Sequence, residues 1–172
     1  LRDGRFLIAQ GGASPITNYF HNSDPSQMYA LDIVKLSALG NRANGFFPAE
    51  LSRYKVFGEV VYSPCNGVIA GVSDGLPDNP PREADRKNTA GNHIVLDCGE
   101  TRVLLAHWMS ESITVKAGQF VKVNTVMARV GNSGDTAEPH LHIQAWKIDK
   151  ADKAVAMTFN GEFLVMNRTF KN

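Results

Sequence analysis

The sequence predicts a single, mainly β domain of antiparallel strands, with an irregular N-terminal arm over residues 1–50 and a β core over residues 51–172. Three observations support this prediction. The chain has 172 residues, the size of one domain. Short apolar segments are separated by turn residues such as Asn-Gly and Asp-Gly pairs. Helical patterns are scarce, and the only mild candidates are Asp32–Leu39 and Pro48–Arg53.

The expected strands of the core follow one another, each bounded by residues that favour turns. The first strand ends at Ser63-Pro64, and Asn66-Gly67 predicts a hairpin turn before the second. Gly118, Asn124 and Gly131 separate the later ones. The expected strands are Val56–Tyr62, Val68–Val72, His93–Asp97, Arg102–His107, Ile113–Val115, Gln119–Val123, Thr125–Val130 and Leu141–Trp146, with a closing hairpin over Val155–Val165.

A long polar stretch interrupts this series between Asp74 and Asn92 and contains Pro77, Pro80 and Pro81. In a compact domain, a loop of this length is typical of a binding-site rim or of a disordered segment.

Composition excludes several classes of protein. The chain has 43% hydrophobic and 20% charged residues, which excludes wholesale disorder. The net charge of +1 offers no bulk electrostatic attraction for nucleic acid or an anionic membrane. No run of 18 apolar residues is present, so no membrane span is expected in this chain. Because the chain begins at Leu1 instead of Met, we expect a mature product or a fragment, with any signal or anchor upstream.

The two cysteines, Cys65 and Cys98, leave two alternatives open. They form a disulfide if the fold brings them within about 6 Å, which would fit an oxidising compartment. Otherwise they are two buried thiols.

The strongest chemical signal is a pair of histidines on one expected strand. Side chains alternate between the two faces of a strand, so His140, His142 and Gln144 project to one side. The opposite side carries an apolar set suited to a core, Leu141, Ile143 and Ala145. Core packing does not explain two imidazoles on the polar face of a strand that is otherwise well patterned. The two histidines therefore indicate a functional site on this face of the strand.

Other residues can complete a metal site. His107 ends an apolar strand, and Asp32 is a carboxylate between apolar residues. A catalytic zinc requires three protein ligands from histidine and carboxylate side chains, with a fourth position open for water. His21, Asp32 and His142 can supply that set only if the fold brings them together. His93, at the head of an apolar strand, is expected to be structural or to lie at the rim.

Three blocks of the sequence resemble the lysostaphin-type (LytM-like) zinc metallopeptidases, a family that cuts peptide bonds in bacterial cell-wall peptidoglycan. The most specific block runs from Gly131-Asn132-Ser133-Gly134 to Pro139-His140-Leu141-His142. The others are Ala106-His107-Trp108 with residues 112–119, and residues 64–72 with residues 91–95. The resemblance implies antiparallel sheets around a cleft, a peptidoglycan peptide as substrate, and a location in the cell envelope, periplasmic or secreted.

The first metal block departs from the family pattern. Its usual His-x-x-x-Asp form would place a histidine four residues before Asp32, where this chain has Met28. A thioether is a poor zinc ligand beside oxygen and imidazole donors. A variant of the family carries its histidine further upstream, after an asparagine, and Asn18-Tyr19-Phe20-His21 resembles that variant. The resemblance therefore makes His21 the substitute ligand.

The resemblance also implies roles for these residues. One Zn²⁺ per chain would be held by His21, Asp32 and His142, and would lower the pKa of a bound water from about 15.7 towards 7. His140 would act as general base. His107 would bind the oxyanion or assist proton delivery to the leaving amine. The resemblance does not say which of the two histidines has which role.

Two other functions compete with this enzyme. Because Met28 replaces the usual ligand, the chain could instead be a degenerate, metal-free domain that binds peptidoglycan or regulates another wall hydrolase. The stretch Val115–Val130 also resembles the turns of biotinyl and lipoyl carrier barrels, but no lysine lies in a suitable hairpin motif. Retention of Asp32, His107, His140 and His142 together favours the enzyme.

Overall fold

The computed structural model describes residues 1–171, although not the side chain of residue 152, and nearly all of its regular structure is β. Two short 3₁₀ helices, η1 (Pro25–Gln27) and η2 (Leu51–Arg53), accompany the strands. The strands are β1 (Arg5–Gln10), β2 (Leu31–Leu36), β3 (Val60–Tyr62), β4 (Gly67–Ser73), β5 (His93–Cys98), β6 (Thr101–Ala106), β7 (Phe120–Val121), β8 (Val126–Arg129), β9 (Leu141–Lys147), β10 (Lys150–Ala154), β11 (Thr158–Phe159), β12 (Glu162–Phe163) and β13 (Thr169–Lys171).

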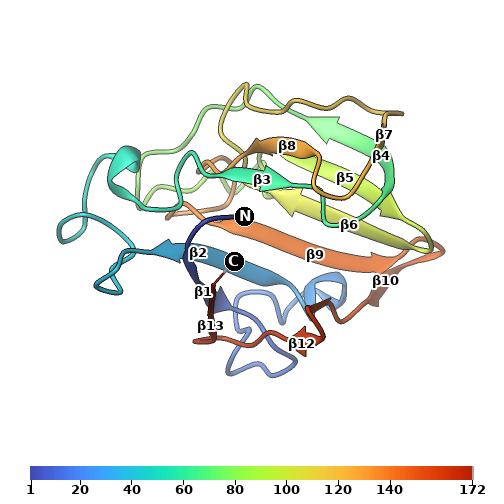
Figure 1. Cartoon of the computed structure of the whole chain (residues 1–172), viewed down its shortest axis with the longest axis horizontal. Helices are drawn as coiled ribbons and strands as arrows, with labels where there is room; N and C mark the ends of the chain where they lie inside the picture. Colours follow the sequence, from blue (N-terminus) through green and yellow to red (C-terminus); the bar gives the residue numbers. More distant parts are fainter. Residues whose placement is uncertain (172) are drawn as a thin grey trace.

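A nine-stranded antiparallel sheet dominates the molecule (Figure 1). Its order is β13-β1-β2-β9-β6-β5-β4-β7, and β10 pairs with the end of β9. The long strand β9 therefore lies between β2 from the N-terminal region and β6 from the middle of the chain. The two smaller sheets are β3–β8 and β11–β12. This fold confirms the predicted mainly β, antiparallel, single-domain architecture.

The alternating pattern of β9 explains its central place. Leu141, Ile143 and Ala145 are each at most 4% exposed and belong to the hydrophobic core. The same core contains Val61 from β3 and Ala128 from β8, so the small β3–β8 sheet packs on the large one. Burying this alternating apolar set fixes the register, because a shift of one residue would turn the histidines into the core.

The N-terminal region is less irregular than the sequence indicates. It contributes β1 and β2 to the main sheet, and the mild helix candidate Asp32–Leu39 is wrong, because Leu31–Leu36 forms a strand. Strand β2 is hydrogen-bonded on both sides, to β1 and to β9. Tertiary pairing of this kind overrides a weak local helix preference. The predicted boundary at residue 50 falls in the loop between β2 and η2.

Most of the other predicted strands are confirmed, with bounds that differ by one to four residues. The first core strand begins at Val60 instead of Val56, because a turn with Gly58 at φ +78° precedes it. Ile113–Val115 is not assigned as a strand, although the Thr114 N–H donates to the Met127 carbonyl. The closing hairpin is present as β11 and β12 around Asn160-Gly161. The second helix candidate, Pro48–Arg53, contains only the single turn η2.

Cys65 and Cys98 form a disulfide, which decides between the two alternatives left open by the sequence. Cys65 lies just before β4 and Cys98 ends β5, and these two strands pair with Val68 opposite Asp97. The hairpin thus brings the two Cα atoms to 6.0 Å, across a sequence separation of 33 residues.

Within residues 1–171, no helix combines the length and the apolar character needed to cross a membrane.

Candidate metal centre

Strand pairing brings the sequence-predicted site residues together. Asp32 on β2 lies directly opposite His142 on β9, and His142 lies opposite Ala106 on its other side. His107 follows Ala106 at the end of β6, so its side chain reaches the same end of the sheet. His21 comes from the segment between β1 and β2, whose helix η1 packs against β9.

The Oδ1 atom of Asp32 is the point on which the imidazoles converge. It lies 3.0 Å from His142 Nδ1, 3.4 Å from His21 Nε2 and 3.4 Å from His140 Nε2. The His107 ring lies 4.8 Å from the His140 ring, measured between centroids. Asp32, His21, His107 and His142 are all buried, each at most 8% exposed. All five residues singled out in the sequence therefore form one cluster.

Within this cluster, two groups of three residues have ligand atoms close enough to share a metal ion. One group is His21, Asp32 and His142, and the other is His107, His140 and His142. In each group the ligand atoms lie within 4.8 Å of one another. His142 belongs to both, whereas His140 groups with His107 and not with His21 and Asp32. The cluster therefore consists of a triad that contains the carboxylate and a pair of histidines, His107 and His140, that lies next to the triad residue His142.

Each of the four rings has its second nitrogen hydrogen-bonded to an oxygen. His107 Nδ1 lies 2.8 Å from the Ser133 carbonyl oxygen, and His140 Nδ1 lies 2.8 Å from that of Glu138. A carbonyl oxygen only accepts, so both Nδ1 atoms carry the proton. In the neutral rings Nε2 is then the free acceptor, and in His140 it faces Asp32.

The remaining two rings are held by side-chain amides. His21 Nδ1 lies 2.7 Å from Asn18 Oδ1, and His142 Nε2 lies 2.9 Å from Gln144 Oε1. The nitrogens that face Asp32 are therefore Nε2 in His21 and Nδ1 in His142.

The triad of His21, Asp32 and His142 fits a zinc ion. Tetrahedral zinc with bonds of about 2.0–2.1 Å to nitrogen and oxygen requires donor atoms about 3.3 Å apart. The Asp32 oxygen lies 3.4 Å from His21 Nε2 and 3.0 Å from His142 Nδ1, close to that spacing. Two imidazoles and one carboxylate are also a ligand set that catalytic zinc uses.

The electrostatics of the cluster favour a charged carboxylate. Burial by itself would raise the pKa of Asp32, but the charge of His140 and the contacts with the His140, His142 and His21 imidazoles outweigh it, and this pKa lies well below its usual range. Asp32 is therefore ionised at neutral pH.

The two histidines of the pair are shifted in opposite directions. Burial, followed by the charges of His140 and His142, holds the pKa of His107 well below its usual range. Burial also lowers the pKa of His140, but attraction to Asp32 and its hydrogen bond outweigh this and raise it. Of the two rings, His140 is consequently the stronger proton acceptor.

The backbone at His107 is unusual. Its φ is +67°, in the left-handed region that residues with a Cβ rarely adopt. The segment is held there by the Gly131 N–H, which donates to the His107 carbonyl, and by the ring's own bond to Ser133. Backbone strain of this kind is stored where surrounding structure over-determines a conformation, often at functional sites.

The long polar loop over residues 74–92 packs against the most specific resemblance block, residues 131–142, as a binding-site rim would. Asn79 Nδ2 donates to the Gly134 carbonyl, and Asp78 accepts the Asn132 N–H. Gly91 has φ +57°, and a Cβ there would collide with the backbone of Ser133. Glycine is required where two backbones approach this closely.

Asn92 ends the long polar stretch, and its sequence neighbours indicate only a turn residue. Asn92 is fully buried, and its amide bonds to Leu76 and Trp108 while its N–H donates to Ser133 Oγ. It thus links the polar loop to the segment that anchors His107. The positions of Asn18 and Gln144, near the predicted ligands, were the only sequence signal for their contacts. His93 bonds to the Gly91 carbonyl and belongs to neither metal group, as expected.

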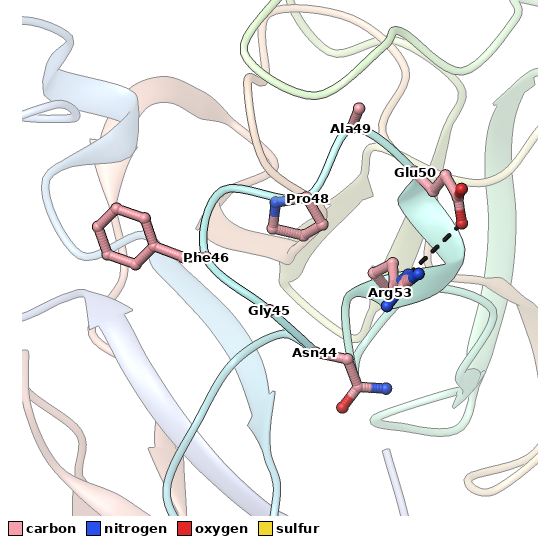
Figure 2. Close-up of a pocket in the computed structure, with 7 residues that line it drawn as sticks. All are labelled: Asn44, Gly45, Phe46, Pro48, Ala49, Glu50 and Arg53. Carbon is pink, nitrogen blue, oxygen red and sulfur yellow. Dashed lines mark ion pairs between the residues drawn. The ribbon is translucent and has the colours of Figure 1, made fainter.

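A surface pocket lies beside the cluster. It has a volume of about 490 Å³, and its lining includes Arg42, Phe47, Tyr54 and Glu138. Glu138 pairs with Arg42 at 3.4 Å, and its carbonyl anchors His140. A smaller adjoining pocket is shown in Figure 2, where the Phe46 ring points away from the Glu50–Arg53 ion pair. The loop between β2 and η2 therefore extends the rim of the site.

Comparisons with known proteins found similarity to solved peptidase structures. Among solved structures, the catalytic domain of lysostaphin from Staphylococcus simulans is 22% identical, with 67% of this chain and 85% of that chain covered and a TM-score of 0.43. The catalytic domain of a mutant of the prophage-encoded M23 protein EnpA from Enterococcus faecalis is 17% identical, with the same coverage and a TM-score of 0.44. A zinc-containing peptidase from Vibrio cholerae is 17% identical, with 73% and 48% covered and a TM-score of 0.40.

A search of curated protein sequences found no match. The sequence profile described as "Peptidase family M23" matches residues 54–156, more than half of the chain. The matched range contains His107, His140 and His142, whereas His21 and Asp32 precede it. The chain belongs to peptidase family M23.

Proposed function

We propose that the chain is a zinc metalloendopeptidase that hydrolyses peptide bonds in bacterial cell-wall peptidoglycan. The observation that carries this proposal is the convergence of three imidazole nitrogens within 3.4 Å of one buried Asp32 oxygen. A buried carboxylate among buried histidines is costly unless it is paired or coordinates a metal. Met28 is exposed and belongs to neither group, whereas His21 belongs to the group with Asp32 and His142.

In this proposal His21, Asp32 and His142 hold one zinc ion. When bound, zinc supplies Lewis acidity that polarises the scissile carbonyl and lowers the pKa of water. Asp32 contributes a negative charge that offsets part of the charge of the metal, and the two histidines contribute neutral donors.

His140 is proposed to accept the proton from the attacking water. Its Nδ1 proton is committed to the Glu138 carbonyl, so Nε2 is the basic atom. Attraction to Asp32 raises the pKa of His140 whereas burial lowers that of His107, so of the two rings His140 is the stronger proton acceptor. The same proton can then pass from His140 to the leaving amine.

His107 is proposed to stabilise the oxyanion. Its Nδ1 proton is held by the Ser133 carbonyl, so it can donate from Nε2 only in its charged form. Burial disfavours that form in the free protein, but negative charge developing on the substrate oxygen would stabilise it, the second proton being taken up from solvent and returned when the oxyanion collapses. The histidine pair therefore provides a proton acceptor for the water, His140, and a hydrogen-bond donor to the oxyanion, His107.

The proposed location is the cell envelope, periplasmic or secreted. The Cys65–Cys98 disulfide supports an oxidising compartment. Peptidoglycan lies outside the cytoplasm, in agreement with this location.

The decisive experiment is digestion of purified peptidoglycan, with and without a chelator, followed by mass spectrometry of the fragments. We expect new peptide ends in the untreated sample and none after chelation. Restoring zinc should restore them. Unchanged fragments in all samples would favour a metal-free regulatory domain, and cleavage that survives chelation would exclude the zinc mechanism.

Two variants sharpen this test. His107→Ala and His140→Ala are expected to abolish cleavage while the zinc content stays near one ion per chain, because neither residue belongs to the proposed triad. Loss of zinc in either variant would show that its residue is a ligand, as in the alternative group of three histidines.

A further inference from the structure

We infer that Asn18 and Gln144 are positioning residues that select which nitrogen His21 and His142 present to the metal. This inference rests on the proposed zinc site and deepens it. Each side chain is buried, with Asn18 1% and Gln144 7% exposed, and each places an amide next to the outward nitrogen of one ring.

The orientation of the Asn18 amide is set by its own surroundings. Its Nδ2 donates to the Met28 carbonyl at 2.9 Å and to the Gly12 carbonyl at 3.3 Å. Both partners are acceptors, so the amide cannot be turned around without losing both bonds. The atom that faces His21 is therefore Oδ1, an acceptor, and His21 Nδ1 must donate to it.

This arrangement leaves only one nitrogen of His21 free to bind a metal. With the proton on Nδ1, the lone pair lies on Nε2, which is the atom 3.4 Å from Asp32. Asn18 thereby fixes the His21 ring to the long segment between β1 and β2. This segment lies outside the residues matched by the family profile. Both carbonyl partners belong to that segment, so it holds the ring without help from the core sheet.

Gln144 acts on the opposite nitrogen. It lies two residues after His142 on β9, so the two side chains are neighbours on the same face of the strand. Its Oε1 accepts from His142 Nε2 at 2.9 Å, so Nδ1, which is hydrogen-bonded to Asp32 at 3.0 Å, is the nitrogen that would bind a metal in place of that bond. The cluster thus uses Nε2 of one ring and Nδ1 of the other, and an amide oxygen fixes each choice.

Partners of this kind orient a ligand and are worth about 10- to 100-fold in metal affinity. We expect Gln144→Met, which has a similar length but no strong acceptor, to weaken zinc binding by about that factor. Gln144→Glu keeps an acceptor oxygen and is expected to bind zinc at least as tightly as the wild type. If Gln144 only filled space, zinc affinity would not be lower in Gln144→Met than in Gln144→Glu.

Zinc affinity would be measured on the whole chain by competition with a chromophoric chelator, with thermal unfolding of the metal-free proteins alongside. Gln119→Met, at a glutamine outside the cluster, is the matched control and should bind zinc like the wild type. Unchanged affinity in Gln144→Met, or equal losses in the Met and Glu variants, would overturn the role of Gln144. If the wild type itself bound no zinc, the proposed function would fail, and the role of Gln144 with it.

The role of Asn18 has a readout that needs no metal and no mutation. Nitrogen-15 NMR distinguishes the two neutral tautomers of a histidine ring. In the metal-free wild type, His21 is expected to carry its proton on Nδ1. A proton on Nε2 would overturn the role of Asn18, whatever the outcome of the zinc measurements. In the zinc-loaded protein, His142 is expected to carry its proton on Nε2.

Discussion

The Nδ1 atom of His142 lies 3.0 Å from the Oδ1 atom of Asp32, although the two residues are 110 positions apart in the chain. Antiparallel pairing of β2 with β9 places them directly opposite each other. Formation of the sheet therefore places the Asp32 carboxylate beside His142 on β9. The site is complete only when the N-terminal strands have joined the sheet.

The ligand role of His21 has a direct consequence for metal content. We expect His21→Ala to lose stoichiometric zinc, because only two donors of the triad would remain. Elemental analysis of the purified variant measures this, with His93→Ala as the control, since His93 belongs to neither metal group. A His21→Ala protein that retains stoichiometric zinc would disprove the assignment.

The left-handed backbone at His107 predicts an unusual order of stability. Glycine adopts positive φ without the penalty of about 1 kcal/mol or more that a Cβ incurs. His107→Gly should therefore be more stable than His107→Ala by about 1 kcal/mol, the reverse of the usual order in a strand or helix. Urea denaturation of the two metal-free variants tests this. A more stable alanine variant would mean that the strain at φ +67° is absent in solution.

Acid should destabilise the metal-free protein partly through His107. Burial and the charges of His140 and His142 lower the pKa of His107, so below about pH 6.5 the unfolded chain binds a proton that the folded chain does not. Stability must then fall as the pH decreases. Between about pH 7 and 5 we expect the wild type to lose more stability than His107→Asn, a variant that tolerates positive φ.

Urea denaturation at a series of pH values would measure that difference. Equal losses in the two proteins would show that the pKa of His107 is not lowered. His140 contributes with the opposite sign, because its raised pKa gives stability that is lost as the pH increases, and it is present in both proteins.

The disulfide should carry a large share of the stability. Replacing both Cys65 and Cys98 by serine removes a cross-link between residues 33 positions apart. A loss of about 2–4 kcal/mol in the free energy of unfolding is typical of such a link. The same loss should appear when the wild type is unfolded under reducing conditions. No change in either experiment would show that the link is not formed.

Asn92 is expected to matter more than its place beside a turn suggests. Asn92→Ala would leave the backbone N–H and carbonyl of Leu76 without their Asn92 partner, at a cost of about 1–3 kcal/mol for each polar group left unpaired, whereas the Trp108 carbonyl would keep its bond from Ser133 Oγ. Hydrogen exchange should also become faster along residues 76–92. The surface variant Asn66→Ala is the comparison, since its single side-chain bond is exposed. Equal effects of the two variants would contradict a structural role for Asn92.

Local patterns in the sequence were sufficient to predict the β class and the geometry of β9. The alternation from His140 to Trp146 separates a core face from a chemical face within one strand, and this depends only on the two-residue period of a strand. Turn residues predicted most strand ends for the same reason, because backbone preferences at glycine, asparagine and proline are local. The family resemblance of residues 131–142 then indicated zinc chemistry at His142.

Only the tertiary structure decided how the N-terminal region contributes. Asp32 lies in a segment with a weak helical pattern, and it became a strand residue because β1 and β9 pair with it on both sides. Such pairing depends on partners far away in the chain, which no local propensity encodes. The disulfide and the contacts of Asn18 and Gln144 were decided in the same way, because each depends on distances and hydrogen-bond directions that exist only after the chain has folded.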